Sequence, residues 1–465
     1  MNVFGRIEGY DSSLQVWHRA SERSSAEGGY ANVGLGYLPE AQWGDSSTAV
    51  EAANTWKLNK HKSFQTLFTF NDYQIDRDSR YVFPSSGTEW FLDDFKWGRG
   101  WSLELEEIYR YQPSKDFSLL AGGVMRYSDV IPKATFIGGY DPRIDPVAQS
   151  GFFDYTDGSG DPQSIPQVSQ VKFWTFAAYL ESQYQIFDKL RLVGGVRVTT
   201  DERYDQTPVT PRFSAIYSMT ERFTTKYMYT QAFVAPAPYF AFATYDNGAL
   251  LATTNPDVNP ETAETHELNF TYYGDDISLG LSAYYGTQAD LILVSDQAAP
   301  QNIVEDPVTV SSGTRTLVQT ANGGDSRRYG VDVYGKIKTN YTSSWISYSY
   351  VDFEQTNQDL VTGLPFISRH NGRCGITWQA TRDLFITPSV VIRSTPENVA
   401  PGSLGKELHD PYEFNLYALY QRNNNLDLFL DLRNITDHHY ALGGFTGDAY
   451  AQETFSGVVG MRLTY

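Results

Sequence analysis

The chain ends in Phe455-Ser-Gly-Val-Val-Gly-Met-Arg-Leu-Thr-Tyr465, which alternates two kinds of side chain. Phe455, Gly457, Val459, Met461, Leu463 and Tyr465 occupy every second position, and Ser456, Gly460, Arg462 and Thr464 lie between them. Successive side chains of a β-strand point to opposite faces of a sheet. The alternation therefore predicts a strand with one apolar face and one mainly polar face.

A hairpin directly upstream repeats this pattern. Leu426, Leu428, Leu430 and Leu432 alternate with Asp427, Asp431 and Arg433, and residues 422–425 connect them to an alternating strand over residues 414–420. Two such strands joined by a short polar turn indicate an antiparallel hairpin. The row of four leucines suits a wall that is apolar all round better than the core of a soluble sandwich.

The same unit recurs along the chain, with connections of two clearly different lengths. Short turns lie at 188–189, 220–221, 275–276 and 381–383, whereas long segments rich in Gly, Pro, Asp and Asn lie at 132–166, 236–260 and 298–326. This alternation is typical of outer-membrane barrels, with short periplasmic turns and long extracellular loops. We predict one all-β domain over residues 1–465, a transmembrane antiparallel up-and-down β-barrel of about 20–22 strands, whose lumen is too wide for side chains to fill.

Composition excludes other classes of protein. No run of about 18 apolar residues is present, which excludes a transmembrane helix in this sequence. The formal net charge of -19 opposes binding to nucleic acid, because a protein must supply Lys and Arg to displace the counterions of phosphates. Cys374 is the single cysteine and cannot form an intramolecular disulfide.

Four segments resemble one family of barrels, and the last residue resembles a signal found in outer-membrane proteins generally. Residues 229–236, Tyr-Thr-Gln-Ala-Phe-Val-Ala-Pro, and 255–262, Asn-Pro-Asp-Val-Asn-Pro-Glu-Thr, resemble the paired FRAP and NPxLxPE segments of TonB-dependent receptors. Residues 283–292 resemble the family strand that ends in Asp-Leu-Ile, and 432–440 resemble the Asn-Leu-Phe-Asp-Lys-Tyr segment before the last strand. Tyr465 resembles the C-terminal aromatic by which outer-membrane proteins are recognised for assembly.

Further details both support this resemblance and depart from it. Asn322 and residues 328–332 resemble the opening of another family strand, and Glu261 is expected to cap or pair near a strand mouth. Val234 stands where the family has an arginine. The N-terminal plug, the TonB box and the signal peptide have no counterpart in this sequence, so we expect the barrel part of such a receptor without its plug.

The resemblance implies a bacterial outer-membrane receptor that takes up a scarce nutrient, most often a ferric siderophore. Its expected partners are outer-membrane lipid, the nutrient ligand and, through the missing plug, the TonB complex; a monomer is expected. The alternative is a diffusion pore without a plug, or a surface-binding barrel. No P-loop, CxxC pair, HExxH or nucleophile and base spacing is present, and we therefore expect no enzyme.

Candidate ligand residues lie in the long segments. Tyr239, Phe240, Phe242 and Tyr245 could stack on a ring-bearing ligand, or could instead form part of the interfacial aromatic girdle or pack the loop upon itself. Arg143 is a further candidate contact. The haem receptors of the family that this chain resembles usually have a histidine between the two signature segments. No histidine lies between residues 237 and 254 here, which disfavours a haem receptor.

One segment could bind a metal ion. Asp154, Asp157 and Asp161 are spaced around glycines so that their oxygens could surround Ca²⁺. The terminal bidentate glutamate of a full calcium loop is missing, and a hydrated surface loop is the alternative. No other cofactor is expected.

Overall fold

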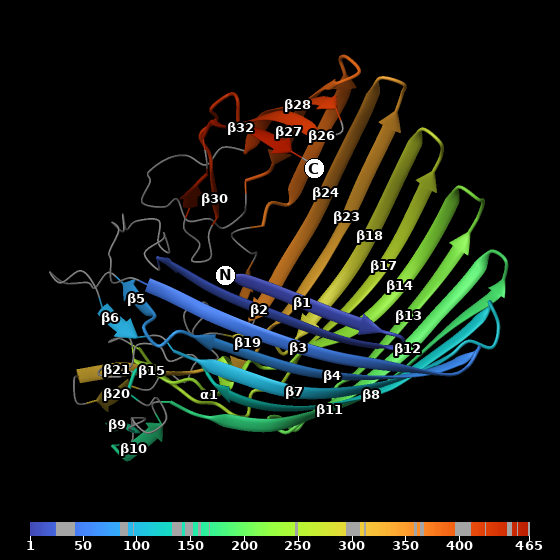
Figure 1. Ribbon diagram of the computed structural model, residues 1–465. Helices are drawn as coiled ribbons and strands as arrows, with labels where there is room; N and C mark the ends of the chain where they lie inside the picture. Colours follow the sequence, from blue (N-terminus) through green and yellow to red (C-terminus); the bar gives the residue numbers. More distant parts are fainter. Residues whose placement is uncertain are drawn as a thin grey trace.

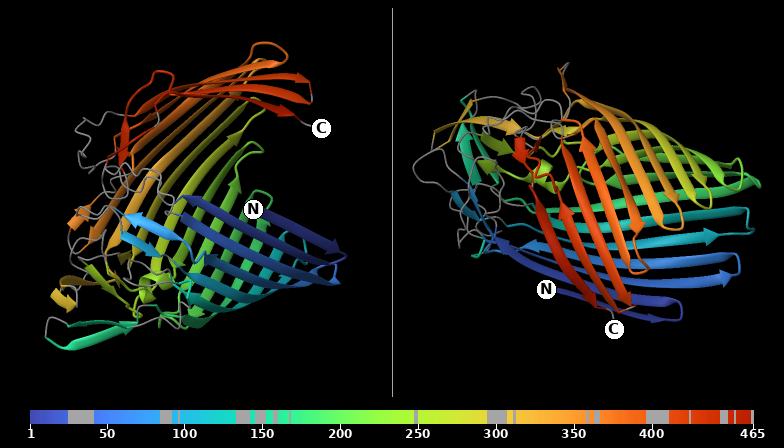
Figure 2. Two further views of the ribbon diagram at one scale, coloured as in Figure 1. Left: turned by 60° about the vertical axis from the view of Figure 1, so that its left-hand side comes forward. Right: turned by 90° about the horizontal axis from the view of Figure 1, so that it is seen from above.

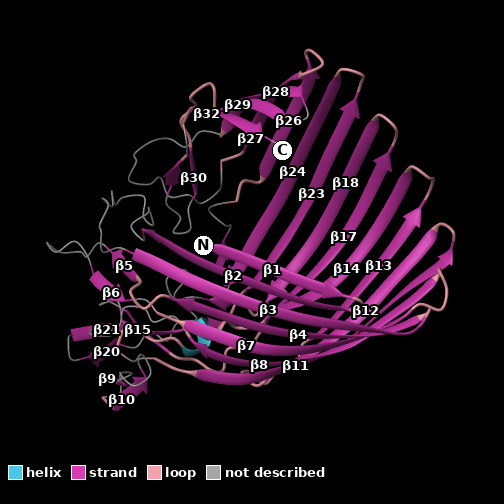
Figure 3. Cartoon of the chain, in the orientation of Figure 1, coloured by secondary structure: helices cyan, strands magenta, loops and turns pink. Residues whose placement is uncertain are grey.

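The computed structural model describes residues 1–24, 42–83, 92–95, 97–132, 142–144, 152–156, 160–166, 168–246, 250–293, 307–310, 313–357, 360–362, 367–395, 411–423, 425–443, 449–452 and 454–463. No helix in these ranges is long and apolar enough to cross a membrane. Nearly all of the regular structure is β-strand (Figure 3).

One antiparallel sheet dominates the molecule. Its main strands are β1 (Asn2–Gly9), β2 (Ser12–Ser24), β3 (Gln42–Asn59), β4 (Lys62–Ile75), β7 (Arg99–Tyr111), β8 (Phe117–Ile131), β11 (Val171–Phe187), β12 (Leu190–Asp201), β13 (Val209–Ser218), β14 (Phe223–Val234), β17 (Glu261–Tyr273), β18 (Ile277–Ala289), β23 (Asp325–Lys338), β24 (Thr342–Asn357), β26 (His370–Gln379), β27 (Leu384–Arg393), β28 (Tyr412–Asn423), β29 (Leu426–Arg433) and β32 (Ser456–Leu463). The short β25 (Leu360–Thr362) pairs with the end of β24 and completes a 20-stranded sheet.

Each main strand pairs with its neighbours in up-and-down order, from the β1–β2 hairpin to the β29–β32 ladder. The sheet curls into a wall whose short turns gather at one end and whose long connections gather at the other (Figure 1). The two views in Figure 2 show the same curvature from the side and from above. These features confirm the predicted all-β, antiparallel, up-and-down architecture.

The two edges of the wall are β1 and β32. Within the described residues, β1 pairs only with β2, and β32 only with β29. Nineteen strands remain when β25 is set aside, so alternation makes β1 and β32 run in the same direction. Both run toward the end with the short turns, which agrees with a last strand that ends on the periplasmic side.

Smaller elements lie at the end with the long connections. A six-stranded sheet joins β10 (Pro162–Pro166), β9 (Phe152–Thr156), β20 (Pro307–Val310), β21 (Gly313–Gln319), β16 (Leu250–Thr253) and β15 (Tyr245–Asp246). Three strand pairs complete the set: β5 (Arg80–Phe83) with β6 (Leu92–Phe95), β19 (Ile292–Leu293) with β22 (Ala321–Asn322), and β30 (Ala441–Gly443) with β31 (Ala449–Ala451). The helix α1 (Pro238–Phe242) follows β14.

The outer face of the wall is apolar. Leu281 lies opposite Phe270 and Val333 on the neighbouring strands, and its side chain remains 42% exposed. Leu428, on β29, lies opposite Tyr420 and is also 42% exposed. A water-soluble sheet would bury such rows in a core, whereas a membrane barrel turns them toward lipid.

The inner face is polar and held by pairs between strands. Arg126 donates to Glu104 at 2.6 Å, and the Tyr179 hydroxyl donates to Glu106 at 2.7 Å. The Tyr179 ring lies over Gly122, where an added Cβ would fall 2.3 Å from the phenol oxygen. Glycine is therefore required there for a large aromatic ring to cross to the next strand along the inner surface.

Candidate functional site

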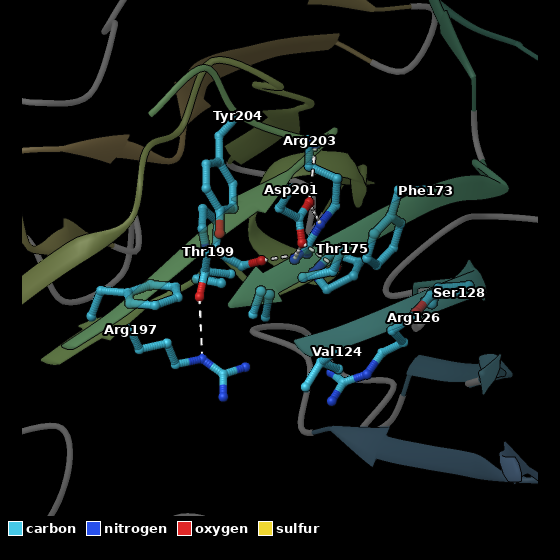
Figure 4. A pocket seen from close by; sticks show the side chains of 17 residues that line it. Val124, Arg126, Ser128, Phe173, Thr175, Arg197, Thr199, Asp201, Arg203 and Tyr204 are labelled. Carbon is cyan, nitrogen blue, oxygen red and sulfur yellow. Dashed lines mark hydrogen bonds and ion pairs between the residues drawn. The ribbon is translucent and has the colours of Figure 1, made fainter. Parts of the chain in front are cut away.

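A pocket of about 460 Å³ opens on the inner face near the end with the long connections. Its walls come from β8, β11 and β12, which contribute Arg126, Thr175 and Asp201 among others, and its rim includes Pro236 after β14 (Figure 4). Each strand contributes alternate side chains, because only every second residue faces inward. Because the pocket lies near the long connections, it lies at the extracellular mouth if the short turns are periplasmic. We call it the mouth pocket.

A buried ion pair organises one side of the mouth pocket. Arg203 donates from Nε and Nη2 to the two oxygens of Asp201 at 2.8 and 2.9 Å, and the side chains are only 11% and 2% exposed. Thr175 Oγ1 donates to the same carboxylate at 2.7 Å. The remaining Nη1 of Arg203 donates to the carbonyl of Pro236 at 2.7 Å, and the guanidinium lies 4.0 Å from the centre of the Phe173 ring.

This ion pair is structural in its geometry. Bidentate Arg–carboxylate contacts are strong and directional, and here the guanidinium also joins the loop after β12 to Pro236, two residues after the end of β14. Removing one partner of such a buried pair would leave an uncompensated charge, at a cost of about 3–5 kcal/mol. Asp201 and Arg203 therefore hold the segments that line the mouth pocket in place. Their hydrogen-bonding groups are occupied by other groups of the protein.

Other polar groups in the mouth pocket retain capacity for a ligand. The Tyr204 hydroxyl is buried and has no hydrogen-bond partner among the described residues. Burial, followed by the nearby Asp201 carboxylate, raises the pKa of Tyr204 to about 12, so its phenol stays protonated and can donate. Arg197 has a long 3.3 Å bond to Thr199 Oγ1, and its guanidinium lies 5.8 Å from the Tyr179 ring centre. Figure 4 shows Arg197 and Arg126 on the strands below Tyr204.

The structure places the predicted aromatic residues near this pocket. Tyr239, Phe240 and Phe242 lie on α1 and are half-buried, and the first two rings meet edge to face at 5.8 Å. Pro238, which opens α1, lines the mouth pocket. Tyr245 begins β15, and its side chain lies outside the described part of the structure. The helix thus forms part of the rim of the mouth pocket. This position is compatible with rings that stack on a ligand and with rings that pack against one another.

Three further predicted site residues that the structure describes, Arg143, Asp154 and Asp161, do not line the mouth pocket. Arg143 lies in an exposed turn and is not among the described residues that line the pocket. Asp154, on β9, accepts a 2.6 Å hydrogen bond from Ser164, and Asp161 directly precedes β10. Asp157 and Tyr465 lie outside the described residues.

The calcium site stays a prediction. Within the described ranges, no group of three or more His, Cys, Asp or Glu side chains is placed to hold a metal ion. The candidate triplet includes Asp157, so it is only partly covered by this observation.

The segments that carry the family resemblance contact one another. Glu261 Oε1 accepts the backbone N–H of Ile292 at 2.6 Å, as expected for a residue that caps a strand mouth. Asn322 Nδ2 donates to the carbonyls of Asn259 and Asp290, each at 2.8 Å, and its Oδ1 accepts the backbone N–H of Asn259 at 2.7 Å. One asparagine therefore fastens together three segments that are distant in the sequence.

The segment before the last strand folds into a turn closed by Asn434. Its side chain accepts from the backbone N–H of His438 and donates to the carbonyl of the same residue, both at 2.9 Å. The backbone of Asn434 has φ of 46°, a left-handed conformation that asparagine tolerates better than most residues. Asp437 Oδ1 then accepts the N–H of Phe455 at 2.9 Å, which aligns the start of β32.

Sequence reasoning missed Asp201, Arg203 and Tyr204. They occur in Thr-Asp-Glu-Arg-Tyr at the end of an alternating strand, where charged loop residues are common. The available signal was an Asp and an Arg two residues apart at a strand end. Only the fold shows that a proline more than 30 positions later completes the cluster.

Comparison with known proteins identifies the fold. The model of the TonB-dependent receptor-like β-barrel matches residues 6–435, whereas no curated protein sequence matches the chain. The siderophore receptor PirA from Acinetobacter baumannii aligns over 100% of this chain and 70% of its own, at 13% identity and a TM-score of 0.73. The copper transporter OprC aligns over 98% and 70%, at 14% identity and a TM-score of 0.66.

A third solved structure, the FrpB iron transporter from Neisseria meningitidis (F5-1 variant), aligns over 97% of this chain and 70% of its own, at 13% identity and a TM-score of 0.65. At these identities the structural similarity establishes the fold alone. The match to the family model covers most of the sequence as well. The chain belongs to the family of TonB-dependent receptor β-barrels.

Proposed function

We propose that this protein is a bacterial outer-membrane receptor for uptake of a scarce nutrient, and that this nutrient is an anionic ferric siderophore. The observation that carries this proposal is the mouth pocket, where Arg197, Arg126 and the unpartnered Tyr204 hydroxyl line an inward-facing recess. Similar structures include a siderophore receptor and an iron transporter, which supports iron as the cargo.

Electrostatics favour an anionic ligand at this position. The chain has a formal net charge of -19 and repels anions at long range. Arg126 and Arg203 are paired with Glu104 and Asp201, so the Arg197 guanidinium and the protonated phenol of Tyr204 are the groups that offset this repulsion locally. Charge-assisted hydrogen bonds are the strongest that neutral or anionic oxygens can accept. The rings of α1 provide an adjacent surface on which an aromatic chelator can stack.

Transport through the wall requires further parts. In the mechanism that we propose by analogy with the family, outer loops capture the ligand and a plug coupled to the TonB complex moves to admit it. The protein would act as a monomer in outer-membrane lipid, without catalysing a reaction. The proposal also includes Arg143 as a loop contact of the nutrient, and Asp154, Asp157 and Asp161 as ligands of a loop-bound Ca²⁺.

Binding of ferric chelates tests the proposal. We would titrate the purified protein in detergent with an anionic ferric tris-catecholate and with a neutral ferric tris-hydroxamate, and record the dissociation constants by calorimetry. The catecholate should bind more tightly. Hydrogen bonds to charged groups contribute about 1.5–3 kcal/mol, so Arg197→Ala should weaken catecholate binding by roughly 10- to 100-fold.

Arg110 offers a matched control. It lies on the inner face near the short-turn end of β7 and donates to Gln65 at 2.8 Å, away from the mouth pocket. Arg110→Ala should leave the affinity unchanged. Equal losses in both variants, or no loss in Arg197→Ala, would contradict the assignment of the site.

Conductance distinguishes the diffusion-pore alternative. A receptor with its coupling parts should stay closed in a planar bilayer, whereas a wide barrel without a plug conducts continuously. A large, constantly open current from the complete gene product would rule out energised transport.

A further inference from the structure

The outer face of the wall carries an ionisable side chain within its apolar band. Along β7 the outward residues are Trp101, Leu103, Leu105, Glu107 and Tyr109, as their alternation and pairing show. Glutamate interrupts an otherwise apolar and aromatic series. Polar residues that face lipid are costly, and an ionisable residue within a membrane span indicates a functional site by default.

The depth of Glu107 follows from its position on the strand. Trp101 and Tyr111 bound the outward aromatic and apolar stretch of β7. Ten residues at about 3.3 Å rise and a tilt of about 40° give a height of roughly 25 Å, the height of the apolar band of such barrels. Glu107 lies four residues from Tyr111, roughly 10 Å inside this band and nearer to the short-turn end. It therefore faces the periplasmic leaflet.

The protein itself compensates this carboxylate only in part. Thr66 Oγ1, directly opposite on β4, lies 3.0 and 2.8 Å from the two carboxylate oxygens, and one hydroxyl can donate only one proton. Within the described residues no Lys, Arg or His forms an ion pair with Glu107. By contrast, the inward Glu104 on the same strand pairs with Arg126.

A groove of about 510 Å³ lies beside Glu107 on the same outer face. Its floor contains Gly123 and Ala178, and its sides include Leu105, Met125 and Phe176. A Cβ added to Gly123 would meet only the Ala177 carbonyl, at 3.7 Å, which shows that the space above the floor is open. The groove thus combines an apolar trough with a carboxylate on one side, and we call it the outer groove.

We propose that the outer groove binds a membrane lipid whose headgroup is a primary amine. The ammonium would donate to Glu107 and neutralise it, while an acyl chain would occupy the apolar trough. A primary ammonium offers three N–H donors beside its positive charge, whereas a quaternary ammonium offers none and an anionic headgroup is repelled. This inference rests on the outer-membrane location in the proposed function but not on the proposed nutrient ligand, because the mouth pocket faces the opposite side of the wall.

Lipid retention tests the inference on the intact protein. We would measure it by native mass spectrometry after incubation with equimolar phosphatidylethanolamine, phosphatidylcholine and phosphatidylglycerol of identical acyl chains. One phosphatidylethanolamine should be retained at least tenfold over either competitor. Glu107→Gln should abolish this preference, and Gly123→Leu, which fills the trough, should reduce retention of the bound lipid.

Glu106→Gln is the matched control, because it removes a carboxylate from the adjacent residue on the inner face. It should retain phosphatidylethanolamine as the unaltered protein does. Equal retention of the amine and choline lipids by the unaltered protein would overturn the inference without recourse to any variant. Unchanged lipid retention in Glu107→Gln would also overturn it. If that variant also lost chemical cross-links that the unaltered protein forms between two copies, the outer groove would be a protein interface instead.

Discussion

Arginine placed on opposite faces of β18 provides a direct test of which face meets lipid. Leu281 points outward between Phe270 and Val333, and the adjacent Ser282 points inward, where its hydroxyl donates to Glu267 at 2.8 Å. Leu281→Arg and Ser282→Arg introduce the same charged side chain one residue apart. Differences between the two variants therefore report the surroundings of each face.

The expected magnitudes differ clearly. Leu281 lies four residues from the start of β18, close to the middle of the apolar band by the same rise and tilt as for β7. Arginine at the bilayer midplane costs about 2–4 kcal/mol. An arginine at position 282 can pair with Glu267 or with Asp332 opposite, so we expect a change in stability within about 1 kcal/mol.

Equilibrium unfolding in phospholipid vesicles would measure these free energies, with heat-modifiable gel mobility as a check on folding. Guanidinium titrations monitored by tryptophan fluorescence should give a lower midpoint for Leu281→Arg alone. Equal destabilisation of the two variants, or a larger loss in Ser282→Arg, would refute the assignment of the faces.

Three further changes test other features. Leu428 lies nearer to the short turns than Leu281. Leu428→Arg should therefore impair assembly less than Leu281→Arg but more than Asp427→Arg, and equal heat-modifiable gel mobility of Leu428→Arg and Asp427→Arg would contradict this. Glu261→Ala should lower the unfolding free energy by about 1 kcal/mol, because the backbone N–H of Ile292 loses its acceptor. The variant should also be cleaved faster by a protease in the loop after Ile292, and an unchanged cleavage rate would argue against a capping role for Glu261. Folding raises the pKa of Tyr204 from 10 to about 12, so the folded state favours the neutral phenol. The stability that this phenol contributes is complete below pH 10 and is lost as the pH rises through about 12. Tyr204→Phe should remove this pH dependence of the unfolding free energy, as measured by unfolding below pH 10 and near pH 12.

The wall could be predicted from sequence because its two faces meet different surroundings at every strand. The leucines from Leu426 to Leu432 alternate along β29 with Asp427, Phe429, Asp431 and Arg433, three of which are charged, and the structure confirms that strand and its hairpin with β28. The alternation is local, so each strand can be read without knowing its partners. Short and long connections then indicate direction and side.

The mouth pocket could not be predicted because its parts are distant in sequence. Asp201 and Thr175 meet across two strands, and Arg203 reaches a carbonyl contributed by Pro236. Register brings these groups together, and alternation alone does not specify register among many similar strands. Aromatic residues of α1 were recognisable as candidates, yet their helical conformation in a Pro-rich segment carried no periodic signal.

Consecutive residues of β8 connect the two proposals and allow them to be separated. Met125 points outward and lines the outer groove, whereas Arg126 points inward and lines the mouth pocket. Changes at sites without shared partners usually combine additively. We therefore expect Gly123→Leu to reduce lipid retention equally in the unaltered protein and in Arg197→Ala, and to leave ferric catecholate affinity unchanged. A change in catecholate affinity on Gly123→Leu would instead show that the sheet transmits strain between its faces, and the two surfaces would then have to be treated as one coupled site.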